Sequence, residues 1–354
     1  MATVQTLLFS SSLLLLLLSV IGGVHGGLDC FSPKPRKLFV FGDSYVDTGN
    51  NMKALASSWQ EPYGITYPGK PTGRYSNGRV FTDFLARFLG IRSPIPFKFR
   101  KYAMDRLIFG ANFAYGGTGV FDTVFPEPNM TTQIDFFQQL INEKIYSQRD
   151  LNNSLAILSL AGNDYSTYLI DHGGNTDGIM DFINKVVDQL ALNMKRIYEL
   201  GVRRVAVNEL APLGCLPQST MDGSFKECDE TRNGLVSYHN MVLETLVAKL
   251  NNETNAKLNQ TANRDAFVTL DLYVAFKNVL NGEQPAGTTK FATPLIPCCK
   301  GTNSTYSCGD VVDGKKMYTI CDNPDAAFFW DYVHPTQEGW RTLYMAMQSD
   351  LHKL

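Results

Sequence analysis

This 354-residue chain lacks an excess of charge of either sign. It has 32 Lys and Arg residues and 34 Asp and Glu residues, and its formal net charge is −2. A chain without a basic field does not attract nucleic acid or an anionic membrane surface, so neither is expected as a partner. Paired Cys-x-x-Cys units are missing too, and no His lies near the cysteines. This pattern speaks against a zinc site, and we expect neither a metal nor a cofactor.

Long apolar runs are also scarce. The longest, Leu13 to Ile21, is followed by two glycines and by Val24-His25-Gly26. This pattern is typical of a secretory signal peptide, and residues 1–26 are expected to be one. The alternative is a transmembrane anchor, but the run is too short and no basic flank follows it. We therefore expect a secreted, extracellular protein whose residues 27–354 form a single domain.

The seven cysteines fit the oxidising compartment that secretion implies. Four of them lie in the Gly/Pro-rich stretch 282–327, which predicts a loop stapled by disulfides. Cys215 and Cys228 are expected to pair across their own loop, and Cys30 to be left over. The pairing among the other four stays open: Cys298, Cys299, Cys308 and Cys321. Glycosylation, a further mark of secretion, is expected at five Asn-x-Ser/Thr sequons: Asn129, Asn152, Asn252, Asn259 and Asn303.

Short apolar runs alternate with amphipathic helical segments along the rest of the chain, whose 44% hydrophobic content is ample for a large core. Strands are expected at 37–41, 107–114, 155–160, 204–208 and 266–271. Helices are expected at 79–89, 179–200 and 233–250 and after Pro335. This alternation predicts a three-layer α/β/α fold with a mostly parallel, five-stranded sheet covered on both faces. Ligands of such folds bind beyond the carboxyl ends of the strands.

Ser44 directly follows the first expected strand, in Gly42-Asp43-Ser44. A serine at this point can present its hydroxyl at the carboxyl edge of the sheet as a nucleophile. The alternative is a plain Gly-Asp-Ser turn, which is common in loops. The chain has no Gly-x-Ser-x-Gly, so this serine does not lie on the nucleophile elbow of ordinary α/β-hydrolases.

Two further polar turns follow strands. Gly116-Gly117-Thr118-Gly119 follows the second strand, and it can be a plain turn, a phosphate cradle or a donor to an oxyanion. No Lys-Ser/Thr follows the glycines, which argues against a P-loop. Asn163 follows the third strand, where its amide can either donate to an oxyanion or form an Asx turn.

Asp331 precedes His334 by three residues, a spacing that lets the carboxylate hold the imidazole in one tautomer. The alternative is a buried structural contact. The other four histidines are weaker candidates for a base. His25 is expected to be removed with the signal peptide, and His239 lies within an expected helix, where a structural role is favoured. His172 lies in a loop and His352 at the chain end. The sequence thus offers a nucleophile, hydrogen-bond donors, a base and a carboxylate that orients the base. Together these groups predict acyl-transfer chemistry.

The order of these residues resembles the GDSL lipase/esterases, also called SGNH hydrolases, and in particular their secreted plant branch. Gly73-Arg74-Tyr75-Ser76-Asn77-Gly78-Arg79, Pro212-Leu213-Gly214-Cys215-Leu216-Pro217 and Phe329-Trp330-Asp331 add to the similarity. The resemblance covers about residues 36–345, and its combined motifs are specific.

The resemblance implies that Ser44 is the nucleophile, His334 the general base and Asp331 the group that orients the imidazole. It also implies an oxyanion hole made by the Ser44 N–H, the Gly117 N–H and the Asn163 amide. Gly116 is the fallback for Gly117 if the loop register shifts by one residue.

Two residues depart from the family pattern. Tyr45 stands in place of the Leu that names the family, and Tyr115 replaces a usual Ser before the two glycines. Neither change removes a reacting atom. Because Tyr45 lies beside the nucleophile, we expect it to affect substrate preference and not the chemistry.

The predicted function is that of a secreted serine esterase or lipase, which hydrolyses small-molecule or lipid-like carboxylic esters through an acyl-Ser44 intermediate, as in lipid degradation. One alternative is an acyltransferase that passes the same acyl group to an alcohol. Another is a non-catalytic cell-wall binding protein on the same fold. The retention of every residue that the chemistry needs argues against the second alternative.

Overall fold

The computed structural model describes residues 34–258 and 265–354. The expected signal peptide, Cys30 and Asn259 lie outside these residues. A sheet of six parallel strands runs through the centre, in the order β2-β3-β1-β4-β5-β6. Its strands are β1 (Lys37–Gly42), β2 (Ile95–Pro96), β3 (Gly110–Asn112), β4 (Ser154–Ser159), β5 (Val205–Asn208) and β6 (Phe267–Leu270). The sheet thus has one strand more than the sequence predicts.

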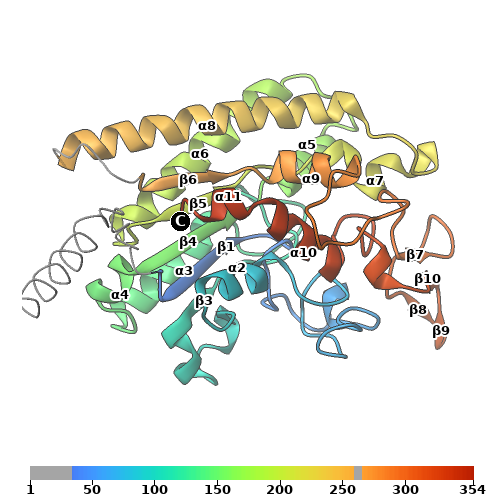
Figure 1. Ribbon diagram of the computed structural model, residues 1–354, viewed down its shortest axis with the longest axis horizontal. Coiled ribbons are helices and arrows are strands. Elements are labelled where there is room, and N and C mark those ends of the chain that lie inside the picture. The colour runs from blue at the N-terminus through green and yellow to red at the C-terminus, as the bar shows by residue number, and fades with distance from the viewer. Residues whose placement is uncertain (1–33, 259–264) are drawn as a thin grey trace, which may run out of the picture. The chain divides into compact units, whose positions relative to one another are not determined.

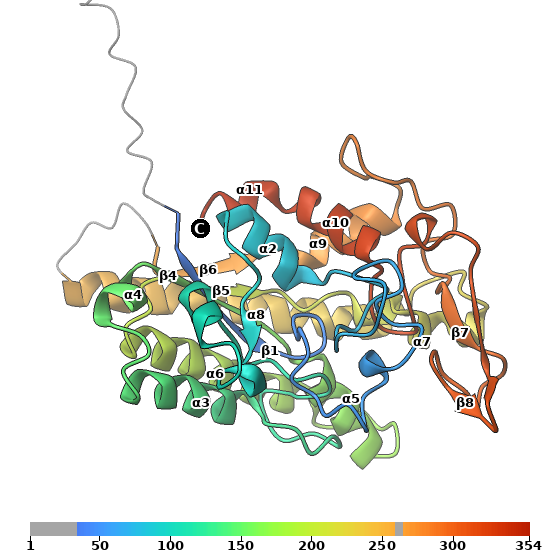
Figure 2. The ribbon, with the colours of Figure 1, turned by 90° about the horizontal axis from the view of Figure 1, so that it is seen from below.

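Helices cover both faces of this sheet, as Figures 1 and 2 show. One face carries α3 (Met130–Asn142), α6 (Ile179–Glu199) and α8 (Glu230–Leu258). The other carries α2 (Phe81–Leu89), α9 (Leu272–Leu280), α10 (Gln337–Ala346) and α11 (Gln348–Leu351). The three-layer α/β/α prediction is therefore confirmed, and residues Pro35–Leu354 form one compact unit.

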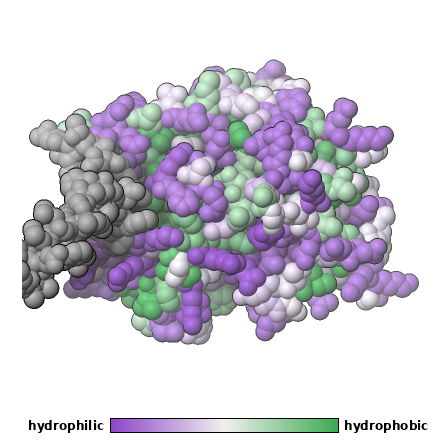
Figure 3. Space-filling model, in the orientation of Figure 1, coloured by the Kyte–Doolittle hydropathy of each residue, from purple (hydrophilic) through white to green (hydrophobic). Residues whose placement is uncertain are grey.

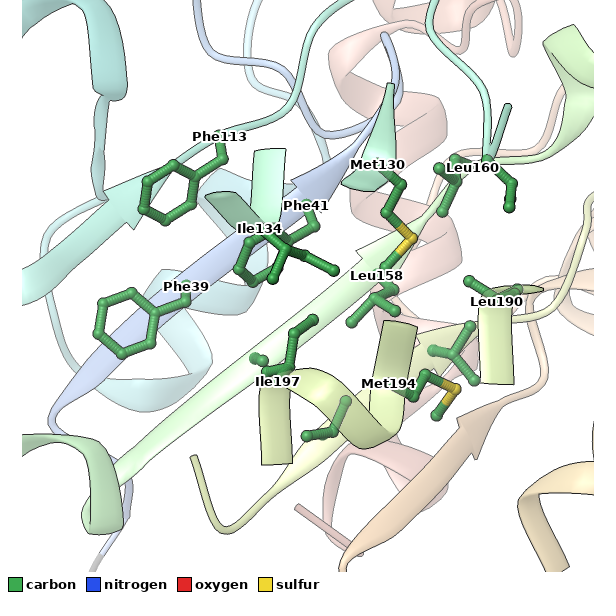
Figure 4. Close-up of a cluster of buried hydrophobic side chains, with 14 of the residues drawn as sticks. Phe39, Phe41, Phe113, Met130, Ile134, Leu158, Leu160, Leu190, Met194 and Ile197 are labelled. Atoms are coloured by element: carbon green, nitrogen blue, oxygen red, sulfur yellow. The ribbon is translucent and has the colours of Figure 1, made fainter. Parts of the chain in front are cut away.

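The strands are buried on both faces, which is why their sequences are continuously apolar. In β1, Phe39 and Phe41 point into the core beneath α3 and α6, where Ile134 and Met194 join them (Figure 4). Leu38 and Val40 alternate with these phenylalanines and belong to the core beneath α2 and α10. Hydrophilic side chains cover most of the face drawn in Figure 3, with apolar ones in small patches between them.

The second expected strand is shorter than the sequence indicates. A 3-10 helix, η3 (Met104–Phe109), occupies much of the apolar run, and β3 begins only at Gly110. Gly110 has a φ of 101°, and a Cβ at this position would collide with the backbone oxygen of Leu38 in the neighbouring β1. The glycine therefore allows the close approach that starts the strand. The sixth strand, β2, pairs Ile95 with Ala111 at the edge of the sheet.

Shorter elements complete the part of the chain that the structure describes. The helices are α4 (Gln148–Asn152), α5 (Gly162–Asp171) and α7 (Pro217–Thr220), and the 3-10 helices are η1 (Ser57–Trp59), η2 (Phe97–Phe99), η4 (Leu213–Cys215), η5 (Met221–Gly223) and η6 (Pro324–Ala326). Two small antiparallel ribbons pair β7 (Cys299–Gly301) with β10 (Tyr318–Ile320), and β8 (Val311–Val312) with β9 (Lys315–Lys316). No helix within the described ranges is long and apolar enough to cross a bilayer.

Three disulfides lie in the described chain. Cys215 is joined to Cys228, as the sequence predicts. In the cysteine-rich stretch, Cys298 is joined to Cys321 and Cys299 to Cys308. Backbone hydrogen bonds tie this stretch to the segment that precedes Asp331, because the Cys298 and Cys299 N–H groups donate to the carbonyls of Phe329 and Trp330.

Candidate active site

Ser44 lies two residues beyond the end of β1, in a tight turn at the carboxyl edge of the sheet. The Val46 and Asp47 N–H groups donate to the Asp43 carbonyl and close the turn. Gly42 enters it with a φ of 147°, and a Cβ there would collide with the backbone oxygen of Ser159 in β4. Glycine is therefore required at this position, and the turn that follows holds Ser44 with 8% of its surface exposed.

His334 joins Ser44 to Asp331. Its Nε2 lies 2.8 Å from the Ser44 Oγ, and its Nδ1 lies 2.8 Å from both carboxylate oxygens of Asp331. Serine and histidine are 290 positions apart in the chain. The contacts bring together a hydroxyl, a base that can take its proton, and a carboxylate that fixes the tautomer of the base.

The Asp331 carboxylate has further donors. The Val333 and His334 N–H groups each donate to its Oδ1 at 2.8 Å, and the buried Tyr63 hydroxyl donates to its Oδ2 at 2.7 Å. Burial by itself raises the pKa of Asp331, but the positive charge of His334 and these hydrogen bonds outweigh it and hold the pKa below its usual value. The carboxylate therefore stays ionised beside the imidazole.

Three residues with free hydrogen-bond donors, Ser44, Gly117 and Asn163, line one cavity. The backbone N–H groups of Ser44 and Gly117 have no acceptor among the described residues, and both residues line the same cavity. The Asn163 Nδ2, at the start of α5, donates to the Thr118 carbonyl at 2.9 Å and keeps a second hydrogen. That these three groups form an oxyanion hole stays a prediction.

Gly116 does not serve as the fallback donor. Its N–H donates to the Asn51 Oδ1 at 2.7 Å and also lies 3.3 Å from the Asp47 Oδ2. Gly117 itself has a φ of 88°, and a Cβ there would collide with the ring of Phe125.

A cavity of about 530 Å³ adjoins these groups. Its wall is mostly apolar, with Leu210, Leu213 and Leu216 among the lining residues. Four large apolar side chains that line it are also strongly exposed, between 46% and 73%: Leu55, Val124, Phe125 and Ile170. Glu209 lines it as well, and burial together with the neighbouring Asp271 and Glu244 raises its pKa well above the usual range.

Tyr45 braces the loop that carries the imidazole. Its hydroxyl donates to the Val333 carbonyl at 3.1 Å, and its ring packs edge-on against His334 and Trp340. Sequence reasoning expected Tyr45 beside the nucleophile but not this contact. It also missed Tyr63, Asn51 and Asp47, which hold Asp331 and Gly116 in place.

The other described histidines lie apart from this site. His239 is buried on α8, where its Nδ1 lies 2.6 Å from the Tyr165 hydroxyl, and burial lowers its pKa to about 3. His172 stacks on Tyr168 at the end of α5. Among the described residues, only Cys215, Cys228 and Glu230 bring three potential metal ligands together, and there the two sulfurs are bonded to each other.

A parallel α/β/α sheet with serine, histidine and aspartate in contact at its carboxyl edge defines the class of serine hydrolases. Comparison with known proteins narrows this class. The family model described as "GDSL-like Lipase/Acylhydrolase" matches residues 38–347, and the chain belongs to this family. It is a carboxylic ester hydrolase.

Relatives in Arabidopsis thaliana are similar over nearly their whole length. GDSL esterase/lipase At5g03610 is 51% identical over 95% of this chain and 93% of its own, and GDSL esterase/lipase At3g09930 is 50% identical over 90% and 89%. Among solved structures, a carbohydrate acetylesterase from Sinorhizobium meliloti matches 90% of this chain and 98% of its own, with 14% identity and a TM-score of 0.40.

Proposed function

We propose that this protein is a secreted serine esterase that hydrolyses carboxylic esters through an acyl-Ser44 intermediate. The observation that carries the proposal is the contact of the His334 Nε2 with the Ser44 Oγ at 2.8 Å, on an imidazole held from its other side by Asp331.

In the proposed mechanism, the Ser44 oxygen attacks the ester carbonyl carbon while its proton moves to the His334 Nε2. The N–H groups of Ser44 and Gly117 and the amide of Asn163 donate to the oxyanion that forms. The carbon–oxygen bond to the alcohol then breaks, and His334 gives the proton to the leaving oxygen. Water, deprotonated by His334, attacks the acyl-serine and releases the acid; the proton returns to Ser44.

The cavity supports an ester with an apolar portion as the substrate. Its wall is mostly apolar, and burial raises the pKa of Glu209, which favours the uncharged form of this carboxyl. The exposed side chains at its edge, among them Leu55 and Phe125, extend this apolar surface outward. Apolar groups of a substrate leave water when they enter, which favours binding.

Secretion is proposed on three grounds. Residues 1–26 have the pattern of a signal peptide that is removed, leaving 27–354 as the mature domain. The three disulfides suit an oxidising compartment. Of the described sequons, three have exposed asparagines, at Asn152, Asn252 and Asn303, whereas the half-buried Asn129 donates from its amide to Asp122. The exposed three are the better glycan acceptors.

The proposal is tested by replacing the nucleophile. Ser44→Ala in the glycosylated, secreted protein should lower p-nitrophenyl ester hydrolysis by on the order of a thousandfold or more. A serine-directed phosphonate should label the wild type and the control Ser237→Ala, which changes an exposed serine on α8, but not Ser44→Ala. Hydrolysis that persists in folded Ser44→Ala would contradict the mechanism.

Product analysis separates hydrolysis from acyl transfer, since both pass through the same acyl-serine. With an added alcohol acceptor, a hydrolase yields mainly free acid, whereas a transferase yields mainly the new ester. A folded wild-type protein that neither turns over any ester nor reacts with the phosphonate would instead support the non-catalytic binding function.

A further inference from the structure

A second hollow lies beside the active-site cavity. It has a volume of about 250 Å³ and lies among α5, α6 and the start of α8. Its wall is mostly apolar; Leu169 of α5, Ile183 of α6 and Leu235 of α8 contribute to it. None of these three residues lines the active-site cavity.

The two spaces adjoin at Ser166, Leu213 and Gln218, which line both; we call this border the neck. Ser166 and Gln218 are exposed and Leu213 is half-buried, so the neck is open to solvent. Ser166 lies on α5, the helix whose first turn carries Asn163. The helix that supplies the proposed oxyanion donor therefore also forms one side of the passage into the second hollow.

Charge in the second hollow is balanced. Asp229 and Arg232 both line it, and the Arg232 Nε lies 4.0 Å from the Asp229 Oδ2. The Arg232 Nη1 also donates to the Ser219 Oγ at 2.8 Å. Because the two charges are opposite, the hollow carries no net charge from this pair. An uncharged hydrocarbon chain is therefore favoured there over an ionic group.

We infer that the second hollow is a binding subsite for the hydrocarbon chain of a long ester substrate. The inference rests on the proposed function, because the chain must extend from an ester held at Ser44. A short chain ends in the active-site cavity, whereas a long chain passes the Leu213 neck and lies between α5, α6 and α8. The chain can belong to the acyl or to the alcohol part of the ester, and the experiment distinguishes these two.

The test uses variants that fill the second hollow, Leu169→Trp and Leu235→Trp. Both side chains are half-buried, and two variants on different helices guard against one that fails to fold. The matched control is Leu192→Trp, on α6, whose side chain is 59% exposed and lines neither space. Ester concentrations stay below the critical micelle concentration.

One arm uses p-nitrophenyl esters from acetate to dodecanoate, and the other uses acetates of alcohols from ethanol to dodecanol. In the wild type, each methylene that leaves water should raise kcat/KM about fourfold. In either filled variant, the ratio of kcat/KM for the longest to the shortest ester should fall about tenfold or more. If this ratio falls for the p-nitrophenyl esters, the hollow binds the acyl chain. If it falls for the acetates, the hollow binds the alcohol chain.

Wild-type chain-length profiles in both filled variants, in both arms, would overturn the inference. Activity of Ser44→Ala is a separate result: if that variant still hydrolyses esters, the proposed mechanism fails, whatever the chain-length profiles show.

Discussion

The carboxylate of Asp331 accepts hydrogen bonds from four groups, of which only the His334 imidazole takes part in the proposed chemistry. Two of the others are N–H groups of its own loop. The fourth, the Tyr63 hydroxyl, comes from a segment 268 residues earlier in the chain. Tyr63 thus acts on the reaction only through Asp331, as a positioning residue.

Tyr63→Phe should lower kcat about tenfold and leave KM nearly unchanged, because a hydrogen bond to a charged group is lost while the ring is kept. The control is Tyr318→Phe. Tyr318 belongs to the same buried cluster as Tyr63, but its hydroxyl has no partner among the described residues. Steady-state kinetics checks the prediction, and equal kcat values in the two variants would contradict it.

Asn163→Ala should lower kcat by about a hundredfold or more, because the oxyanion would lose its side-chain donor. The substrate's ground state gains little from this donor, so KM should change far less. Asn175→Ala, in the exposed loop after α5, is the control. A kcat like that of the wild type would remove Asn163 from the site.

The contact among Ser44, His334 and Asp331 could be anticipated because each residue follows a strand or lies within one local motif. Asp331 and His334 are three positions apart, and Ser44 directly follows an apolar strand. Tyr63 could not be predicted, since no local pattern reports a partner so far along the chain. The choice between Gly116 and Gly117 also needed the structure, because only there does the Asn51 amide oxygen occupy the first N–H.

At the scale of elements, the ribbon of β7 and β10 supports the loop of the proposed acid and base. The Cys299 N–H donates to the Trp330 carbonyl, and the Trp330 N–H donates to the His334 carbonyl. The disulfide between Cys299 and Cys308 fixes the start of this ribbon. The cysteine-rich stretch is therefore connected by hydrogen bonds to the residues on both sides of Asp331.

The double substitution of Cys299→Ala and Cys308→Ala should reduce the free energy of unfolding by about 2–4 kcal/mol. It should also lower kcat at a temperature where circular dichroism shows the variant folded, because the loop of Asp331 and His334 loses its support. A variant that is less stable but has the wild-type kcat would show that the ribbon does not position this loop.

The signature segment 73–79 has a similar role. The Ser76 hydroxyl donates to the Pro335 carbonyl, and the Asn77 Oδ1 accepts from the Gln337 N–H. Arg74 is paired through two hydrogen bonds with Asp83 of α2. The segment thus links α2 to the start of α10, just after His334.

Long, periodic elements could be predicted from the sequence, and short ones could not. The helix α6 spans Ile179–Glu199, close to the range 179–200 that its apolar spacing predicts. The strand β2 has two residues, one of them proline, and gives no pattern to detect. The helix α5 begins at Gly162, and only two residues separate it from the end of β4. Its first residues, Gly162-Asn163-Asp164, are typical of a turn, so the sequence did not indicate a helix there.

At the scale of the whole molecule, buried carboxyl groups set the dependence of stability on pH. Burial raises the pKa of Asp43 to about 7 and that of Asp47 and Asp164 to about 6. Because these values exceed those of the unfolded chain, the folded state binds more protons than the unfolded one from about pH 4 to 7. Their contribution to stability is present below this range and is lost as the pH rises through it.

Asp331, Asp83 and His239 act in the opposite direction, because their pKa values are lowered on folding. The contribution of the two aspartates is lost as the pH falls below about 4, and that of the neutral His239 is lost as the pH falls from about 6.5 to 3. We therefore expect the free energy of unfolding to be greatest near about pH 4 to 5 and to decrease towards pH 8. Urea unfolding across this range checks the expectation, and Asp164→Asn should reduce the slope between pH 5 and 8. An unchanged slope would show that Asp164 does not contribute to the pH dependence of stability.

The separation of 290 residues between Ser44 and His334 has a consequence for biosynthesis. Ser44 follows the first strand of the sheet, whereas His334 lies just before α10, beyond all six strands. A nascent chain therefore carries the serine through the synthesis of the next 290 residues without its partner imidazole. Under the proposed mechanism, no esterase activity arises before the segment of Asp331 and His334 has been made and has packed beside Ser44.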